Sequence, residues 1–263
     1  MKRIVRLVLV LLLAAVGPAH ATDLAAFTAA RDSLQHGVNQ GRADRVLAAR
    51  AAFETLAAAE PDSMALLYWV TVCDWRATPL AMRGPNRKVA QAICDHGLAT
   101  AEKVLNRSPR DAGTLALKAG LLGLSLSFQD ASAAMTIGPQ MMTLFGQATA
   151  LSPDDPRVAF LDALNTFHMP AFYGGGPAKA LPKFEGAIQL FDHALPGGPL
   201  AATWGHDDAL LWAGQCEQRL GNLERARADY QRALAVNPGN GWVRHQLLPA
   251  LDSTATAEKR DGH

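Results

Sequence analysis

The side chains that could carry out acid–base, nucleophilic or metal chemistry are scattered along the sequence. The histidines occur singly, without a His-x-x-x-His pair or a cluster of carboxylates beside them. No Gly-x-Ser-x-Gly motif is present, and Cys73-Asp74 has no identifiable histidine base. His206-Asp207-Asp208 is typical of a helix start, where acidic side chains complement the helix dipole. The sequence therefore predicts no catalytic residue, no metal site, no cofactor and no enzymatic activity.

The segment 169–177, Met-Pro-Ala-Phe-Tyr-Gly-Gly-Gly-Pro, interrupts an otherwise helical pattern. Its aromatic pair, Phe172 and Tyr173, is followed by three glycines, Gly174, Gly175 and Gly176. Glycine permits close backbone approach, and free N–H groups at the start of the next helix favour an anion. The segment is therefore a candidate rim that receives a carboxylate or phosphate, although it lacks the Lys-Ser/Thr pair of a P-loop. The alternative is a structural turn in which the two aromatic rings pack against the next helices.

Tryptophan and arginine side chains offer binding chemistry of a different kind. Trp69 and Trp75 lie on one predicted helix and Trp212 on another, where ring faces can grip a peptide or an apolar ligand. Arg76, next to Trp75, can hold an acidic group. The alternative is that most tryptophans fill gaps between helices. Trp242 follows an Asn-Gly pair and is expected to fix the final helix onto those before it.

Residues 135–145 form an apolar stretch around Gly138-Pro139. Methionine side chains adapt to varied partners, so Met135, Met141 and Met142 are compatible with an interface or a ligand-facing surface. Ordinary packing between helices is the alternative.

Composition limits the fold and the class of partner. Of the 263 residues, 49% are hydrophobic, 6% aromatic and 19% charged, and alanine is abundant, which favours closely packed helices over sheets. The formal charge of +1 becomes −2 when Lys2, Arg3 and Arg6 are removed with the first 21 residues, leaving 22 basic and 24 acidic residues. A nearly neutral chain without a basic patch argues against nucleic acid as the partner.

The first 21 residues have the pattern of a secretory signal peptide. Basic residues come first, an apolar run extends from Leu7 to Val16, and Ala19-His20-Ala21 places small residues for cleavage after Ala21. The run is shorter than the roughly 20 residues that span a bilayer, and an uncleaved membrane anchor is the alternative. We therefore expect a periplasmic or secreted protein with a helical domain over 22–251 and a disordered tail over 252–263.

Three cysteines, Cys73, Cys94 and Cys216, leave at least one thiol without an intramolecular partner. Cys73 and Cys94 fall on neighbouring predicted helices, which is compatible with a disulfide between them. The alternative is that all three are buried small hydrophobic residues, as free cysteines commonly are.

A spaced pattern of small, aromatic, small and proline residues marks the end of the chain. Ala226, Tyr230, Ala233 and Pro238 follow one another at intervals of four, three and five residues, and Gly214 lies twelve residues before Ala226. Small residues allow two helices to approach closely, the aromatic ring fills the gap between successive helix pairs, and proline ends the second helix.

The same pattern recurs upstream in weaker form. Its prolines and the equivalent Asp192 lie 48, 44, 39 and 46 residues apart, so the units have long helices or inserted loops. Five copies in order predict helix pairs that bury their apolar faces against one another. The residues that carry the upstream copies are Ala49, Phe53, Leu56 and Pro61; Ala101, Val104 and Pro109; Phe145, Ala148 and Pro153; and Ala180, Phe184 and Ala187.

The spacing predicts an all-α fold of five helical hairpins and a capping helix. The first helices are expected over 23–39, 63–77, 111–127, 156–168 and 206–220. The second helices are expected over 42–59, 86–107, 138–151, 177–193 and 222–236. The capping helix is expected over 240–250.

The pattern over 207–238 resembles the tetratricopeptide repeat (TPR), and residues 23–250 as a whole resemble exported bacterial TPR proteins. One position differs, because Glu217 stands where the family usually has a tyrosine. The resemblance implies a TPR-like α-solenoid that binds a protein or peptide partner in its concave groove and carries out no chemistry.

The resemblance also implies that the first helices line this groove. Trp69, Trp75, Arg76 and Trp212 are therefore expected to contact the partner, with the segment 169–177 as a rim.

The large insertions between repeats, together with the sequence Tyr173-Gly-Gly-Gly-Pro-Ala-Lys-Ala180, are similar to the T component associated with periplasmic TRAP transporters. This narrower resemblance implies an alternative function, in which the chain binds or passes a small apolar or anionic ligand to a transporter substrate-binding protein. An open polar groove would favour peptide binding, whereas an enclosed apolar cavity would favour the transport accessory.

Overall fold

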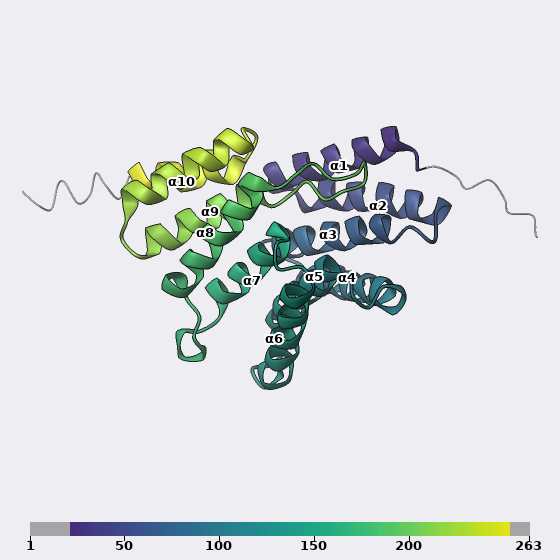
Figure 1. The fold of residues 1–263 in the computed structure, drawn as a ribbon, viewed down its shortest axis with the longest axis horizontal. Coiled ribbons are helices and arrows are strands. Elements are labelled where there is room, and N and C mark those ends of the chain that lie inside the picture. The colour runs from purple at the N-terminus through teal and green to yellow at the C-terminus, as the bar shows by residue number, and fades with distance from the viewer. Residues whose placement is uncertain (1–21, 253–263) are drawn as a thin grey trace, which may run out of the picture.

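The computed structural model describes residues 22–252, which form helices and connecting loops without a strand (Figure 1). The predicted signal segment 1–21 and residues 253–263 of the predicted tail lie outside the described residues. Asp252 still belongs to the last helical turn, and its carboxylate lies 2.7 Å from Arg227 Nη2. The helical domain therefore extends one residue beyond the predicted boundary.

Five hairpins follow one another along the chain and end in a short helical segment, which confirms the predicted fold. The first helices are α1 (Leu24–Asn39), α3 (Met64–Ala81), α5 (Ala112–Ser125), α7 (Pro156–His168) and α9 (His206–Arg219). The second helices are α2 (Ala43–Ala59), α4 (Arg87–Arg107), α6 (Ala133–Leu151), α8 (Pro177–His193) and α10 (Leu223–Val236). Short helical turns cover Leu126–Phe128, Ala171–Tyr173 and, in the capping segment, Val243–Leu247.

The helices form two layers. The first helices pack against one another in the order α1, α3, α5, α7 and α9 and make the inner layer. Each second helix packs against the first helix of its own hairpin and of the next, and so belongs to the outer layer. Helix α6 departs from this arrangement, because it packs mainly on α5 and projects away from the rest of the molecule (Figure 1).

The repeat signature lies in the core, as the spacing predicts. Tyr230 is fully buried, and a Cβ atom added at Gly214 would lie only 2.6 Å from its ring, so the close approach of α9 and α10 requires glycine there. Helices α2, α4, α6 and α10 each end two residues before a proline. The other buried signature residues are Ala49, Phe53, Ala101, Val104, Phe145, Ala148, Ala180, Phe184, Ala187, Ala226 and Ala233.

Two helix boundaries differ from prediction because a proline is tolerated inside a helix. Helix α3 continues to Ala81 rather than ending at residue 77, with Pro79 exposed in its last turns. Helix α6 begins at Ala133 rather than at residue 138, although Pro139 removes one backbone donor from it. Ile137, two residues before this proline, is buried.

The first and last hairpins are in contact, so the solenoid closes on itself. Asn39, the last residue of α1, exchanges side-chain hydrogen bonds of 2.8 and 3.2 Å with Asn237, which directly follows α10. A Cβ atom at Gly241 would lie 2.6 Å from the backbone oxygen of Asn39, so the two chain segments touch through their backbones. This contact joins residues 198 positions apart in the sequence.

Candidate functional site

The inner-layer tryptophans are core residues, which corrects the expectation that they line an open groove. Trp69 is 1% exposed and Trp75 is 7% exposed. Trp69 stacks on Phe53 at 5.5 Å and meets the edge of Phe27 at 5.7 Å between ring centres. Trp75 packs against Phe160 of α7 and Trp204, so neither ring face is available to an external partner.

A segment of the chain itself, residues 194–205 between α8 and α9, covers these tryptophans. Trp69 Nε1 donates a 2.9 Å hydrogen bond to the backbone oxygen of Leu200. The buried ring of Trp204 lies 5.4 Å from that of Trp75, and Arg157 of α7 donates to the backbone oxygen of Ala202. Figure 1 shows this segment running from α8 across to α1 and α3 before it returns to α9. The inner face of α3 thus holds an extended peptide, but the peptide belongs to the same chain.

Arg76 is likewise engaged inside the molecule, so the expectation that it holds a partner's acidic group is wrong. Its guanidinium forms a two-pronged ion pair with Asp208, with 2.8 Å between Nη1 and Oδ1. It also lies over the rings of Trp75 and Trp204, at 4.7 and 5.2 Å from their centres. The pair connects α3 to the start of α9 and stabilises the closed arrangement.

Asp207, beside this ion pair, is a buried carboxylate that also holds the closure. Its Oδ2 accepts hydrogen bonds from Asn237 Nδ2 at 2.7 Å and Asn240 Nδ2 at 3.2 Å. The side chain is nearly inaccessible, and burial, with the neighbouring charge of Asp208, raises its pKa to about 6. The predicted helix start at His206–Asp208 is present, but the two carboxylates point into the structure.

Trp212, the remaining predicted groove residue, is partly exposed on α9. Its ring meets Phe167 at 5.0 Å and Trp242 at 5.7 Å, both edge to face. Trp242 therefore fixes the capping segment onto the last hairpin, as expected. Arg83 lies over the ring of Trp242, 5.8 Å from its centre, and links the cap to the end of α3.

The aromatic pair of the rim loop, residues 169–177, points into solvent. Phe172 is 80% exposed and Tyr173 is 69% exposed, and their ring centres lie 4.2 Å apart. The alternative in which they pack against the next hairpin is therefore wrong. Two large aromatic side chains held together in solvent are a feature of surfaces that bind other molecules.

Backbone hydrogen bonds hold the rim loop in one conformation. Gly174 and Gly176 adopt φ angles of 87° and 98°, which favour glycine. The N–H of Gly176 donates to Thr166 O at 2.9 Å, and that of Gly175 donates to Pro170 O at 3.2 Å. A Cβ atom at Gly175 would lie 2.1 Å from a backbone oxygen, so each of the three predicted glycines serves a tight turn. The exposed aromatic pair is thus presented on an ordered support.

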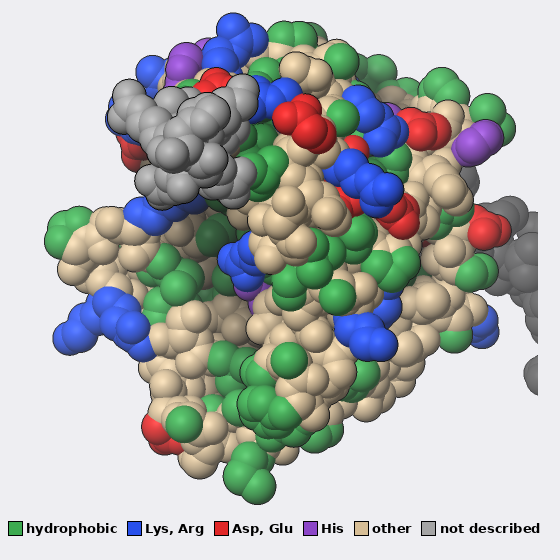
Figure 2. All heavy atoms as spheres, turned by 90° about the vertical axis from the view of Figure 1, so that its left-hand side faces the viewer, with side chains coloured by type: hydrophobic (Ala, Val, Ile, Leu, Met, Phe, Trp, Pro, Cys, Tyr) green, Lys and Arg blue, Asp and Glu red, His purple; other side chains and the backbone are tan. Residues whose placement is uncertain are grey.

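The projecting helix α6 adds apolar surface on the same side of the molecule as the rim loop (Figure 1). Met135 and Met142 are exposed, and residues 131–153 contain no charged side chain. Figure 2 shows that most of the charged side chains on one face lie in its upper half, whereas hydrophobic side chains occur in both halves.

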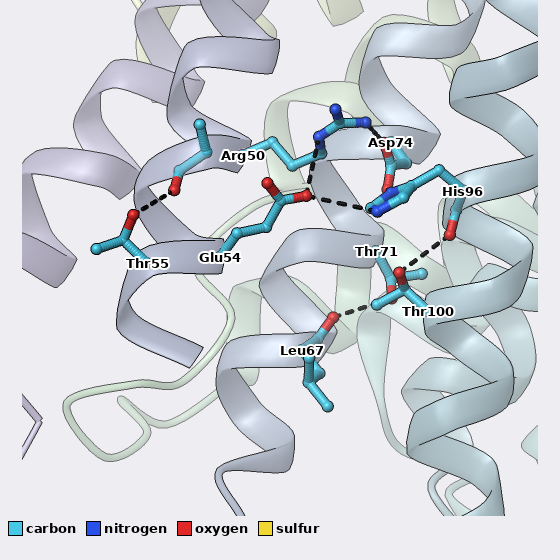
Figure 3. A network of polar contacts seen from close by, with 9 residues as sticks. Arg50, Glu54, Thr55, Leu67, Thr71, Asp74, His96 and Thr100 are labelled. Atoms are coloured by element: carbon cyan, nitrogen blue, oxygen red, sulfur yellow. Dashed lines mark hydrogen bonds and ion pairs between the residues drawn. The ribbon is translucent and has the colours of Figure 1, made fainter. Parts of the chain in front are cut away.

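A polar network that the sequence did not reveal joins the second and third helices to the fourth (Figure 3). Asp74 of α3 is fully buried, yet its carboxylate lies 2.6 Å from Arg50 Nη1 of α2 and 2.7 Å from His96 Nδ1 of α4. Glu54 of α2 completes the network, with its Oε1 3.3 Å from Arg50 Nε and 3.5 Å from His96 Nε2. The two carboxylates therefore face one arginine and one histidine.

The network favours a protonated His96. Both ring nitrogens face carboxylate oxygens, and both can donate only as an imidazolium. The hydrogen bond to Asp74 accordingly raises the pKa of His96. With Arg50 and His96 positive and Asp74 and Glu54 negative, the four charges balance, which allows a buried carboxylate in the core of a helical hairpin.

This network forms one end of an open groove of about 560 Å³ between α2 and α4, floored by α3. His96, Thr100, Lys103 and Arg107 line it from one face of α4, at intervals of three and four residues. The apolar lining comes from Ala57, Ala58, Pro61, Leu67 and Val70. Because the groove opens to the surface, it is not the enclosed cavity that would favour the transport accessory.

The three cysteines and Glu217 are buried and have structural roles. Cys73, Cys94 and Cys216 are all free and buried, so the predicted alternative is confirmed over the disulfide. Burial raises the pKa of Cys94 and Cys216 to about 12, which keeps them protonated at neutral pH. Glu217, in place of the family tyrosine, is buried and accepts a 2.6 Å hydrogen bond from Asn222 Nδ2.

Within residues 22–252, no helix combines the length and apolarity needed to cross a membrane. Across that same part of the chain, no group of histidine, cysteine and acidic side chains has an arrangement that could hold a metal ion.

Comparison with known proteins supports the architecture. The tetratricopeptide-repeat family model matches residues 207–240. The HusA haemophore from Porphyromonas gingivalis is similar with a TM-score of 0.61 at 19% identity, over 77% of this chain and 96% of that one. A thermophilic TPR protein from Thermus thermophilus has a TM-score of 0.56 at 18% identity, over 84% of this chain and 98% of that one. No curated protein matches the sequence. The chain therefore has a TPR-like all-α fold, and residues 207–240 match the tetratricopeptide-repeat family model.

Proposed function

We propose that this chain is an exported, non-catalytic scaffold that binds a protein partner through the rim loop and the adjoining side of the molecule. TPR folds generally serve as protein-interaction scaffolds, which supports the class of function. The observation that carries the site is the exposure of Phe172 and Tyr173 on a loop whose backbone is fixed by hydrogen bonds. A fixed aromatic pair loses little conformational freedom on binding, which favours affinity.

The inner face offers a partner less accessible surface than the sequence predicts. Its tryptophans are covered by residues 200–204, so a partner reaches only the part around Trp212. We propose no catalytic step, because the network around Asp74 is balanced in charge and each ring nitrogen of its histidine already faces a carboxylate.

Site-specific photo-crosslinking in the periplasm tests the rim loop. A photoreactive phenylalanine analogue at position 172 is expected to trap one partner, whereas the same analogue at the exposed Val89 of α4 is expected not to trap it. The double variant Phe172→Ser/Tyr173→Ser should lose the partner and keep its helical circular dichroism, while Leu195→Ser, another exposed apolar position, should retain it. Equal capture by the double variant would refute the rim loop as the binding site.

Export has its own test, because it depends on residues outside the described part of the chain. N-terminal sequencing of the protein recovered from the periplasm is expected to begin at Thr22. A retained Met1 would contradict the signal peptide without bearing on the rim loop.

A further inference from the structure

Helix α6 lacks the second neighbour that the other internal second helices have. Helices α2, α4 and α8 each pack between the first helix of their own hairpin and the first helix of the next. Helix α6 packs mainly on α5, makes little contact with α7 and projects from the rest of the molecule (Figure 1). In the described part of the chain, no helix fills the place beside α6 that α3, α5 and α9 fill beside α2, α4 and α8.

The exposed side of α6 carries a stripe with the spacing of a seam between two helices. Alternating steps of four and three residues place side chains on one line along a helix, which is how a helix packs lengthwise against another. The stripe is about 21 Å long at 1.5 Å per residue. All of its members are exposed, Met135 to 81% and Met142 to 56%. They are Met135, Pro139, Met142, Gly146 and Thr149.

Gly146, within this stripe, is not needed for the packing of the single chain. A Cβ atom added there would meet nothing within 4 Å. A glycine inside a helix nevertheless costs about 0.5–1 kcal/mol relative to alanine. Close approach of another backbone accounts for a glycine at such a position.

The absence of charge on α6 favours a second copy of this chain as the occupant. Among the helices α1–α10, α6 alone has no charged side chain, and the uncharged run extends over residues 131–153. A two-fold contact brings the same surface of both copies together, so a charged stripe would repel itself whereas an uncharged one is self-compatible. A partner recognised by its charge, or an anionic lipid surface, would find no complementary group there.

We infer that two copies of this chain associate through α6, with the two stripes packed along each other about a two-fold axis. Each α6 then has a second helical neighbour, and Met135 and Met142 of both copies leave water. Eleven of the 19 residues of α6 are exposed, about half of the 20–30 that each side of a standard interface contributes. The dimer is therefore expected to be weak, with a Kd of about 1–100 µM.

This association goes beyond the proposed scaffold function and does not depend on it. The contact uses neither Phe172 nor Tyr173, so the dimer presents two rim loops. A partner with two binding sites for the loop would be held more tightly by the dimer than by one chain.

Sedimentation velocity from about 1 to 200 µM, which spans the expected Kd, measures the association. Met142→Glu, which places like charges at the centre of the seam, is expected to give a monomer at all these concentrations with unchanged helical circular dichroism. Val89→Glu, at an exposed apolar position of α4, is the matched control and should keep the dimer. Gly146→Ala should weaken the dimer without lowering the free energy of unfolding, because its methyl group has space in the single chain.

Cysteine crosslinking tests the geometry. Met142 is the midpoint of the stripe, so it faces its own copy whether the two helices run parallel or antiparallel. Met142→Cys is expected to form a disulfide-linked dimer under mild oxidation, whereas Gln147→Cys, exposed on another side of α6, is expected not to. The three natural cysteines are buried and do not compete.

A dimer that forms in this concentration range and is lost in Met142→Glu supports the inference. A protein that stays monomeric, a dimer that survives Met142→Glu, or crosslinking at both cysteine positions alike would overturn it. Loss of the dimer in Phe172→Ser/Tyr173→Ser would also overturn it, by placing the contact on the rim loop. Flotation with phosphatidylcholine vesicles that Met142→Glu abolishes, in place of a dimer, would assign the stripe to lipid instead.

Discussion

Asp207 makes the free energy of unfolding depend on pH, and a single substitution should remove this contribution. Burial raises the pKa of its carboxyl from 3.8 to about 6. Because the folded state favours the protonated form, the resulting stabilisation is complete below pH 3.8, the unfolded value. It is lost as the pH rises through the folded pKa. The shift of about two pKa units corresponds to about 3 kcal/mol in the free energy of unfolding.

The variant Asp207→Asn keeps the shape and an oxygen that can accept from Asn237 and Asn240, but it carries no charge. It also relieves the repulsion from Asp208, while the ion pair between Asp208 and Arg76 remains. The variant is therefore expected to gain up to about 3 kcal/mol over the wild type at pH 7 relative to pH 4.

Urea unfolding followed by circular dichroism, at half-unit steps from pH 4 to pH 8, measures this difference directly. Other carboxylates titrate over the same range in both proteins, so only the difference between the two curves reports on Asp207. Asp95→Asn, an exposed position on α4, is the matched control and should run parallel to the wild type. Parallel curves for Asp207→Asn as well would refute the assignment of a strained, buried charge to this position.

Three further substitutions test the closure, the repeat packing and the polar network. Asn39→Ala removes the exchanged hydrogen bonds between the first and last hairpins and should lower the free energy of unfolding by about 1–2 kcal/mol, with a larger radius of gyration by X-ray scattering. Gly214→Ala places a methyl group against a buried ring and should cost about 1–3 kcal/mol in urea unfolding, whereas Gly186→Ala has open space and should not destabilise. His96→Gln should destabilise the protein more at pH 6 than at pH 9. Hydrogen bonding to Asp74 raises the pKa of His96 in the folded state above its ordinary value of 6.5, so the stabilisation by the imidazolium is present below pH 6.5 and is lost as the pH rises through the folded-state pKa.

Each of these has an outcome that contradicts it. An unchanged radius and stability for Asn39→Ala would mean that the hairpins are held together without this contact. Equal effects of the two glycine substitutions would mean that α9 and α10 have room to separate. A His96→Gln penalty independent of pH would mean that His96 is neutral in the folded protein.

The sequence could predict the hairpins because their determinants are local. Ala226 and Tyr230 lie one turn apart on one helix, and their spacing alone states which face is buried and how closely a neighbour can approach. The proline that follows the second helix in four of the five units is read in the same way. Burial of Trp69 and Trp75 could not be inferred from such spacing, because a tryptophan on an apolar face suits a core and a binding groove equally well.

The polar network between α2, α3 and α4, unlike the rim loop, could not be predicted from the sequence, for a different physical reason. Arg50, Asp74 and His96 are separated by 24 and 22 residues, and each looks unremarkable on its own helix. They meet only because three consecutive helices stack in a register that depends on the packing of many apolar side chains. Asp74, within the apolar run of α3, is the one signal available, since a carboxylate buried on a core helix requires a cationic partner.

The covering of the inner face determines where binding can occur. Exposing the ring of Trp204, which packs against Trp75 and Phe160, would cost about 3–5 kcal/mol, the scale measured for removing a large aromatic side chain from a core. The hydrogen bond from Trp69 to Leu200 and the one from Arg157 to Ala202 would be lost with it. A partner competing for that face would need to recover all of this before gaining any affinity. A partner at the rim loop or on the exposed side of α6 displaces no part of the protein, so these two surfaces are where binding is least costly.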